Sequence, residues 1–250
     1  MSKAESPRPV KSVWGPWTTV GFGLAIFAVY FVAQSLVAIG FAMAKVVSDP
    51  ALDPEALAES LATNGLVIAT SIIFSAIVGI GIMAVFIRLR KGASIAQYLA
   101  LKAINARTFF ALMGITVGLL VLLAVVGVFL GIPSDSEFSV EVYRTSVFPA
   151  LLWIAFVIFA PAFEESFFRG FLFAGLQQSR VGAAGAIALT ALAWAGLHLQ
   201  YDIYGMAEVV VLGVVLGIVR LKTGSLWGSL AIHSFWNIIA TVATALSASG

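Results

Sequence analysis

Residues 108–131 read TFFALMGITVGLLVLLAVVGVFLG, and this apolar run decides the fold class. About 20 consecutive apolar residues are enough for a helix to cross a bilayer. The whole chain has the same character, since 61% of its 250 residues are hydrophobic and 10% are charged. A water-soluble domain of this size carries about a quarter charged residues. We therefore predict an all-α protein, a polytopic helical bundle embedded in a membrane.

Similar apolar runs occupy most of the chain. They predict seven spans, near residues 17–45, 65–88, 107–131, 147–178, 183–200, 203–221 and 226–247. The fourth run is too long for one simple crossing at about 1.5 Å per residue. It contains Pro149 and Pro161, which predict a kink or a break into two helical pieces. We expect seven transmembrane helices, or eight if the fourth run breaks.

Two shorter segments predict helices outside the spans. In SDPALDPEALAESLATN, residues 48–64, Asp53 suits an N-cap and Pro54 the first helical position, with Gly65 closing the loop. Residues 94–105, SIAQYLALKAIN, predict an amphipathic helix at the membrane interface. The polar segment 1–16 precedes an apolar run too long for a cleaved signal peptide, so we expect a retained anchor.

Lysine and arginine are enriched in cytoplasmic loops, so their distribution predicts topology. Basic residues gather before the first span and in every second loop: Lys3, Arg8, Lys11, Arg88, Arg90, Lys91, Lys102, Arg107, Arg180, Arg220 and Lys222. The alternate loops hold only two basic residues, Lys45 and Arg144, together with the acids Asp49, Asp53, Glu55, Glu59, Asp135, Glu137, Glu141 and Asp202. This asymmetry predicts a cytoplasmic N-terminus and a C-terminus on the outer side.

A few polar side chains remain within the spans. They are Glu164, Glu165, Arg169, His198, Glu208, His233 and Asn237. Ionisable groups at membrane depth usually face the protein interior or a wet cavity, and they mark functional sites. The chain has no cysteine, which excludes disulfides, thiolate metal ligands and a cysteine nucleophile.

The spacing of these residues separates the two glutamates. Glu165 and Arg169 are four residues apart on one helix face, in the favourable order for an ion pair. Glu164 is rotated by about 100° from Glu165 and therefore stays available. Counted from the cytoplasmic loops, Glu164, His198, His233 and Asn237 lie at similar depths, roughly 14–24 Å along their helices.

A carboxylate, two imidazoles and a carboxamide suit the hydrolysis of an amide. The carboxylate and one histidine can bind and deprotonate water, while the other two groups donate hydrogen bonds to the developing oxyanion. Ser166 and Ser234 adjoin these residues, but each points away from the face of its neighbour, which disfavours a serine nucleophile.

Three motifs resemble those of a known family. EESFFR, WAGLH and HSFWN are similar to the motifs of the CPBP intramembrane proteases, the family of type II CAAX prenyl proteases and lysostaphin-resistance proteins. The family often has Phe at the position of Trp194, a departure that we do not expect to affect the chemistry. The resemblance covers residues 147–240 well and the preceding chain weakly.

The resemblance implies a glutamate-dependent endopeptidase of the cell (inner) membrane whose site opens towards the cytoplasmic side. Glu164 and His198 would activate water, His233 and Asn237 would stabilise the oxyanion, and Glu165 would pair with Arg169. It also implies three regions: a cytoplasmic tail (1–16), N-terminal transmembrane helices with one interfacial helix (17–145) and a protease core (146–248). The partners would be the lipid bilayer and a membrane-associated protein or peptide substrate, a class that includes prenylated CAAX-like proteins. Nucleic acid is not an expected partner.

The metal content stays open at this stage. The family is commonly called metalloprotease, yet the chain has two histidines and no HExxH motif. Zinc on Glu164, His198 and His233 is chemically possible. We prefer a directly activated water and expect no tightly bound cofactor.

Each polar residue also has a purely structural interpretation. The Glu165–Arg169 pair can lock a helix, His198 can bond a backbone carbonyl, and His233 and Asn237 can bond neighbouring helices. For Glu208 we favour such a structural role. Gly213 and Gly217 form a GxxxG motif, which predicts close helix packing. Trp14 and Trp17 suit interfacial anchors.

Two other functions compete with the protease. Intramembrane Glu and His residues also serve proton relays in transporters, but the chain shows no internal repeat of the kind that transporters have. A catalytically silent scaffold or immunity protein would carry the same membrane helices.

Overall fold

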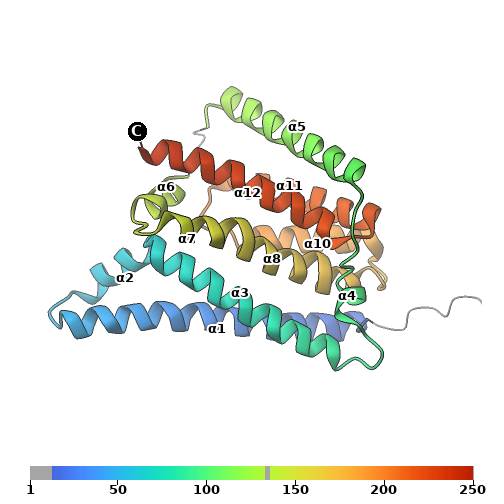
Figure 1. Ribbon diagram of the computed structural model, residues 1–250, viewed down its shortest axis with the longest axis horizontal. Helices are drawn as coiled ribbons and strands as arrows, with labels where there is room; N and C mark the ends of the chain where they lie inside the picture. Colours follow the sequence, from blue (N-terminus) through green and yellow to red (C-terminus); the bar gives the residue numbers. More distant parts are fainter. Residues whose placement is uncertain (1–12, 133–135, 250) are drawn as a thin grey trace, which may run out of the picture.

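The computed structural model describes residues 13–132 and 136–249, and these residues fold into a bundle of helices without strands (Figure 1). This confirms the predicted all-α class. In chain order the helices are α1 (Pro16–Ser48), α2 (Pro54–Ala62), α3 (Gly65–Arg88), α4 (Ile95–Tyr98), α5 (Ala106–Leu130), α6 (Glu137–Arg144), α7 (Pro149–Ile154), the π-helical η1 (Ala155–Phe159), α8 (Ala160–Glu165), the π-helical η2 (Ser166–Leu172), α9 (Phe173–Leu176), α10 (Gly182–Ala195), α11 (Ile203–Thr223) and α12 (Leu226–Ser249).

Within the described residues, six helices are long and apolar enough to cross a membrane. They are α1, α3, α5, the continuous helix from Pro149 to Leu176, α11 and α12. The fifth predicted span, residues 183–200, is wrong in its length. Helix α10 has only 14 residues, about 21 Å at 1.5 Å per residue, which is shorter than a hydrocarbon core of about 30 Å. A non-helical segment, residues 196–202, follows it and carries His198.

The predicted break in the fourth span does not occur. Pro149 stands at the start of α7, where its missing N–H is not needed, and Pro161 lies at the start of α8. Between them, η1 widens the helix, and the Ala160 amide bonds the Ala155 carbonyl five residues back. The π-helical turn accommodates Pro161 without ending the helix.

The two predicted surface helices have different outcomes. Helix α2 forms as expected, with the Asp53 side chain accepting a hydrogen bond from the Ala56 amide. Gly65 does not close the loop but begins α3, which Asn64 caps. In segment 94–105 only Ile95–Tyr98 is helical. The rest is not helical: residues 99 and 100 form a turn with Ala100 at a φ of 53°, and the Leu226 amide at the start of α12 donates a hydrogen bond to the Ala100 carbonyl.

Close packing joins α10 to α11 at the predicted GxxxG motif. A Cβ atom added at Gly213 would lie 3.0 Å from Ala191 Cβ, and one at Gly217 would lie 3.0 Å from Ile187 side-chain atoms. Both glycines therefore let the two backbones approach. The expected anchors differ from each other: Trp14 donates its indole N–H to the Phe86 carbonyl at 3.0 Å, whereas the Trp17 side chain is 87% exposed.

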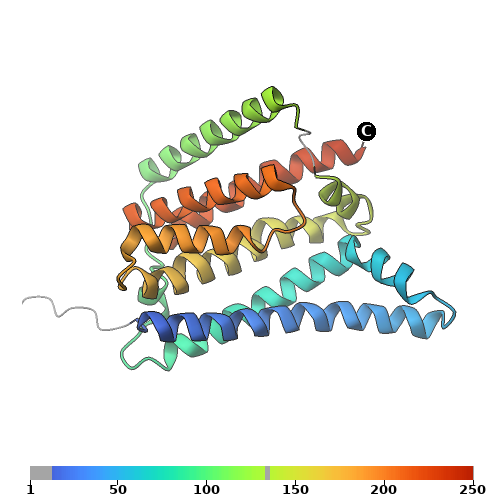
Figure 2. The same ribbon diagram turned by 180° about the vertical axis from the view of Figure 1, so that it is seen from behind.

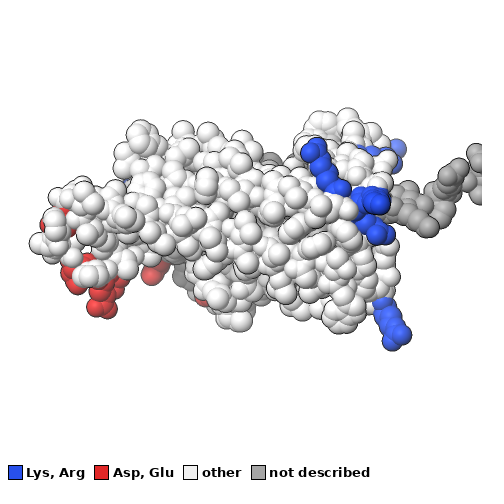
Figure 3. Space-filling model, turned by 90° about the horizontal axis from the view of Figure 1, so that it is seen from below, with Lys and Arg blue, Asp and Glu red and all other residues white. Residues whose placement is uncertain are grey.

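Helices α1 and α5 form opposite edges of the bundle when it is seen from either side (Figures 1 and 2). Charged side chains gather at its two ends, with Lys and Arg at one and Asp and Glu at the other (Figure 3). We call these the basic end and the acidic end. The start of α1 and the α3–α5 connection lie at the basic end, whereas α2 and α6 lie at the acidic end (Figure 1).

Candidate active site

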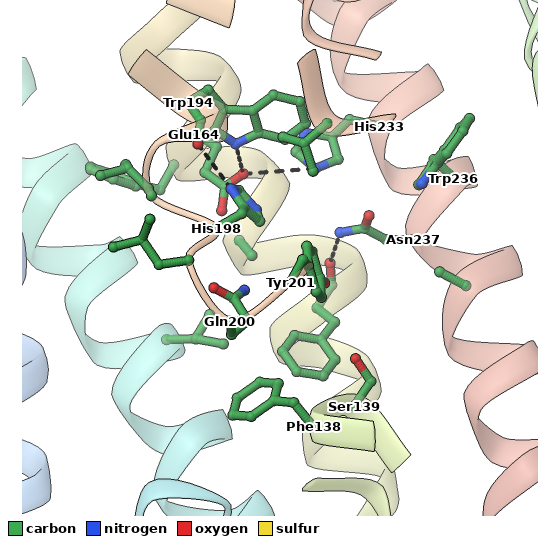
Figure 4. Close-up of a pocket in the computed structure, with 18 of the residues that line it drawn as sticks. Phe138, Ser139, Glu164, Trp194, His198, Gln200, Tyr201, His233, Trp236 and Asn237 are labelled. Carbon is green, nitrogen blue, oxygen red and sulfur yellow. Dashed lines mark hydrogen bonds and ion pairs between the residues drawn. The ribbon is translucent and has the colours of Figure 1, made fainter. Parts of the chain in front are cut away.

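A cavity of about 510 Å³ lies inside the bundle, and four of the predicted site residues line it. Glu164 comes from α8, His198 from the segment after α10, and His233 and Asn237 from α12 (Figure 4). The fold thus brings together side chains from three parts of the chain. Glu208 does not line this cavity.

The Glu164 carboxylate is held at one oxygen only. Its Oε2 accepts a hydrogen bond from the indole Nε1–H of Trp194 at 2.6 Å, and His233 Nε2 lies 3.8 Å from the same oxygen. Within the described residues, Oε1 accepts no hydrogen bond. The side chain is 19% exposed, so this second oxygen is available to a molecule in the cavity.

Trp194 is a site residue that the sequence interpretation missed. It is 2% exposed, and its ring packs edge-on against His198 and His233 at centroid distances of 5.2 and 5.0 Å. The Arg169 guanidinium lies 4.6 Å from its ring centroid. A phenylalanine could fill this volume but could not donate to Glu164, and that difference was the available signal.

Glu165 has two partners rather than one. Its Oε1 lies 3.0 Å from Arg169 Nη1 and 3.0 Å from His233 Nδ1, and Glu165 and Arg169 are fully buried. Arg169 Nη2 also donates to the Gly213 carbonyl at 3.1 Å. The carboxylate requires a proton on His233 Nδ1, so a neutral His233 presents a lone pair at Nε2.

His198 is oriented by the end of its own helix. Its Nδ1 lies 2.9 Å from the Trp194 carbonyl in the last turn of α10, which also accepts the Leu197 amide. A carbonyl can only accept, so Nδ1 carries the proton and Nε2 has the lone pair. The structural role expected of a helix-end histidine therefore also fixes the tautomer that could accept a proton from water.

Asn237 bonds a carbonyl that the π-helical turn leaves free. In η1 the Ala160 amide bonds Ala155 rather than Phe156, and the next amide in line is missing because residue 161 is proline. Asn237 Nδ2 donates to the Phe156 carbonyl at 2.8 Å. One N–H of the carboxamide is thus used structurally, and the second remains for a ligand.

The donor set is a poor match to a zinc site. Within the described residues, no group of three or more His, Cys, Asp or Glu side chains is placed to hold a metal ion. Of the three candidate ligands, Glu164 Oε2 is bonded to Trp194 and His233 Nδ1 is bonded to Glu165. These residues therefore do not fit a bound zinc ion.

The cavity extends from Glu164 towards the acidic end. Its far part is lined by Phe138, Ser139 and Tyr143 of α6, by Gln200 and Tyr201, and by Thr244 near the end of α12. Tyr201 stands outside the spanning helices; burial raises the pKa of its phenol, and the Glu164 charge raises it further. The phenol therefore remains a hydrogen-bond donor at neutral pH.

The cavity therefore leads away from the basic end of the bundle, where the Lys and Arg side chains gather (Figure 3). The depth count from the basic loops placed the four residues correctly within the bundle but did not show to which end the space between them leads. The predicted cytoplasmic opening and the predicted cytoplasmic position of the basic end remain two predictions, and the direction of the cavity is compatible with only one of them.

A scan against protein families matches residues 146–239 with the family described as Type II CAAX prenyl endopeptidase Rce1-like. The match includes all four cavity residues and the Glu165–Arg169 pair. No curated protein and no solved structure matches the chain. Residues 146–239 of this helical membrane protein are therefore similar to the Rce1-like domain of the type II CAAX prenyl endopeptidase family.

Proposed function

We propose that this protein is an intramembrane endopeptidase that hydrolyses membrane-associated proteins or peptides with a water molecule activated by Glu164 and His198. The observation that carries the proposal is the half-bonded carboxylate of Glu164. One oxygen is fixed by Trp194 and the other faces a cavity that His198 also lines. The family match favours a peptidase over a transporter or a silent scaffold.

In the proposed reaction, Glu164 and His198 Nε2 accept hydrogen bonds from one water molecule. The water oxygen attacks the peptide carbonyl carbon while Glu164 takes one of its protons. A tetrahedral oxyanion results. The proton then passes to the leaving nitrogen, the C–N bond breaks, and a carboxylic acid and an amine are released.

His233 and Asn237 are placed to stabilise the oxyanion. Asn237 can donate its second N–H while the first stays on the Phe156 carbonyl. His233 can donate from Nε2 only when the ring carries both protons, because Glu165 already holds the proton on Nδ1. Preorganised donors of this kind contribute roughly 3–4 kcal/mol each to transition-state stabilisation.

The assignment of Glu164 as general base is tested by Glu164→Gln, which preserves shape and removes the base. We expect cleavage to fall by a factor of about 10²–10⁴, with folding in membranes unchanged. The measurement is a comparison of membrane proteomes with the wild-type and Glu164→Gln proteins, in which uncleaved precursors accumulate. Glu208→Gln is the matched control, an intramembrane glutamate outside the cavity. Near-normal cleavage by Glu164→Gln rules the proposal out.

A further inference from the structure

The cavity and the charges of the bundle point to the membrane face from which substrate arrives. We propose that the catalytic cavity opens on the extracytoplasmic face, and that its substrate is an uncharged protein segment presented there. The proposal rests on the proposed peptidase function for the identity of the substrate, but not for the direction of the opening.

The lining residues define one open direction. Along the helix that begins at Pro149, they run from Leu152 to Phe168, and along α12 they run from His233 to Thr244. Helix α6, at the acidic end, contributes three more. No residue of the α3–α5 connection, of α9 or of the α11–α12 connection, all at the basic end, lines the cavity.

The basic end is closed by a packed aromatic layer. Phe167, Phe168 and Phe171 are each at most 4% exposed and belong to the main hydrophobic core. Leu99 from the segment after α4 packs against Gly170, where an added Cβ would approach its side chain to 2.8 Å. A substrate arriving from that end would have to displace this core, which is close-packed and resists such a change.

The charge distribution assigns the two ends to the two faces. Among the described residues, the loop Lys and Arg side chains other than Lys45 and Arg144 belong to the basic end, and Figure 3 shows the separation on one face of the bundle. Lys3, Arg8 and Lys11 lie outside the described residues. Cytoplasmic loops are enriched in Lys and Arg. The acidic end, with the mouth of the cavity, is therefore extracytoplasmic.

The lining also restricts the chemistry of the substrate. Among the described residues that line the cavity there is no Lys or Arg. A free C-terminal carboxylate bound near Glu164 would meet a like charge without a compensating cation, which is unfavourable in a poorly solvated site. Aromatic rings and the neutral polar groups of Ser139, Gln200 and Thr244 instead suit an uncharged internal segment.

The absence of cysteine from the chain allows a direct test of the opening. Single cysteines are introduced as Gln200→Cys at the mouth, Glu55→Cys on α2 and Lys222→Cys at the basic end, all exposed positions. Each variant is treated with a membrane-impermeant maleimide in right-side-out and inverted vesicles. We expect Gln200→Cys and Glu55→Cys to react in right-side-out vesicles and Lys222→Cys in inverted ones.

Two labelling outcomes would overturn the proposal. If the maleimide labels Gln200→Cys in inverted vesicles, as it labels Lys222→Cys, the mouth of the cavity opens to the cytoplasm. If all three positions show the reverse of the expected pattern, the whole bundle is inverted. Neither result depends on catalysis. Labelling the same three positions in the Glu164→Gln background should therefore give the same pattern.

The substrate is tested separately by mapping the cleavage sites that disappear in Glu164→Gln membranes. We expect them in uncharged extracytoplasmic segments, and sites in cytoplasmic segments or at free C-termini contradict the proposal. If no cleavage site disappears, the proposed peptidase function fails, while the labelling pattern still decides the direction of the opening.

Discussion

At the scale of single residues, the indole N–H of Trp194 distinguishes this site from one with phenylalanine at the same position. A hydrogen bond to an ionised group contributes about 1.5–3 kcal/mol. Without it Oε2 of Glu164 loses the donor that holds the carboxylate in place. For Trp194→Phe we therefore expect kcat/KM to fall by about tenfold or more, and we expect no further fall when Trp194→Phe is added to Glu164→Gln.

The matched control is Trp236→Phe, because the Trp236 ring lines the same cavity but makes no hydrogen bond to Glu164. It should leave kcat/KM nearly unchanged. A merely structural role for Trp194 predicts that Trp194→Phe lowers the residual activity of Glu164→Gln as well, and that result would remove Trp194 from the positioning of the base.

The residue types at the site were predictable from sequence, but their partners were not. Helical spacing indicates the Glu165–Arg169 contact because both residues lie on one helix. It carries no information about His233, which reaches Glu165 from a helix 68 positions away in the chain. The role of Trp194 depends on its hydrogen bond to Glu164, which lies on another helix. From sequence alone, Trp in place of Phe was therefore not expected to affect the chemistry.

At the scale of elements, the π-helical turn before Pro161 leaves the Phe156 carbonyl without a backbone donor, and Asn237 supplies one. Asn237→Ala leaves the Phe156 carbonyl without a partner, which costs about 1–3 kcal/mol. Pro161→Ala supplies a new amide N–H beside that carbonyl. We expect Asn237→Ala to reduce the free energy of unfolding less in the Pro161→Ala background than in the wild type.

Chemical denaturation in detergent micelles measures this coupling, and Pro149→Ala serves as the control because Pro149 only begins its helix. Cleavage should stay impaired in the double variant if Asn237 also donates to the oxyanion. Additive losses of stability would show that the two residues act independently.

Most helix positions followed from apolar run length, because a bilayer sets a minimum span. The exceptions are segments whose conformation is set by tertiary contacts. Residues 99–105 have an amphipathic pattern, yet a turn at residues 99 and 100, bonded to the start of α12, ends the helix before them. Helix α10 ends at Ala195 and leaves His198 in a non-helical segment, where the sequence pattern predicts a continuing span.

At the scale of the whole molecule, the composition was sufficient to predict a membrane bundle, whereas the orientation that the loop charges indicate stays a prediction. The direction of the cavity could not be predicted, because it depends on which helix ends pack closely and which remain apart. Depth along each helix is a one-dimensional measure, and residues at similar depths can face a space that opens to either end. Only the packing around Phe167 and Phe171 shows that the basic end is closed.

The same closed layer contains the ion pair on which the stability of the bundle should depend. Arg169 joins η2 to α11 through the Gly213 carbonyl, and Glu165 joins α8 to α12 through His233. Removing one partner of a buried pair leaves an uncompensated charge, which costs about 3–5 kcal/mol. Glu165→Gln and Arg169→Met should each reduce the free energy of unfolding by about this amount.

The double variant buries no unpaired charge, so its loss of free energy of unfolding should be smaller than the sum of the two single losses. A parallel cycle of Glu165→Gln with the exposed Lys222→Met should be additive. Additivity in the Glu165–Arg169 cycle itself would show that the contact, although short, does not hold the helices together.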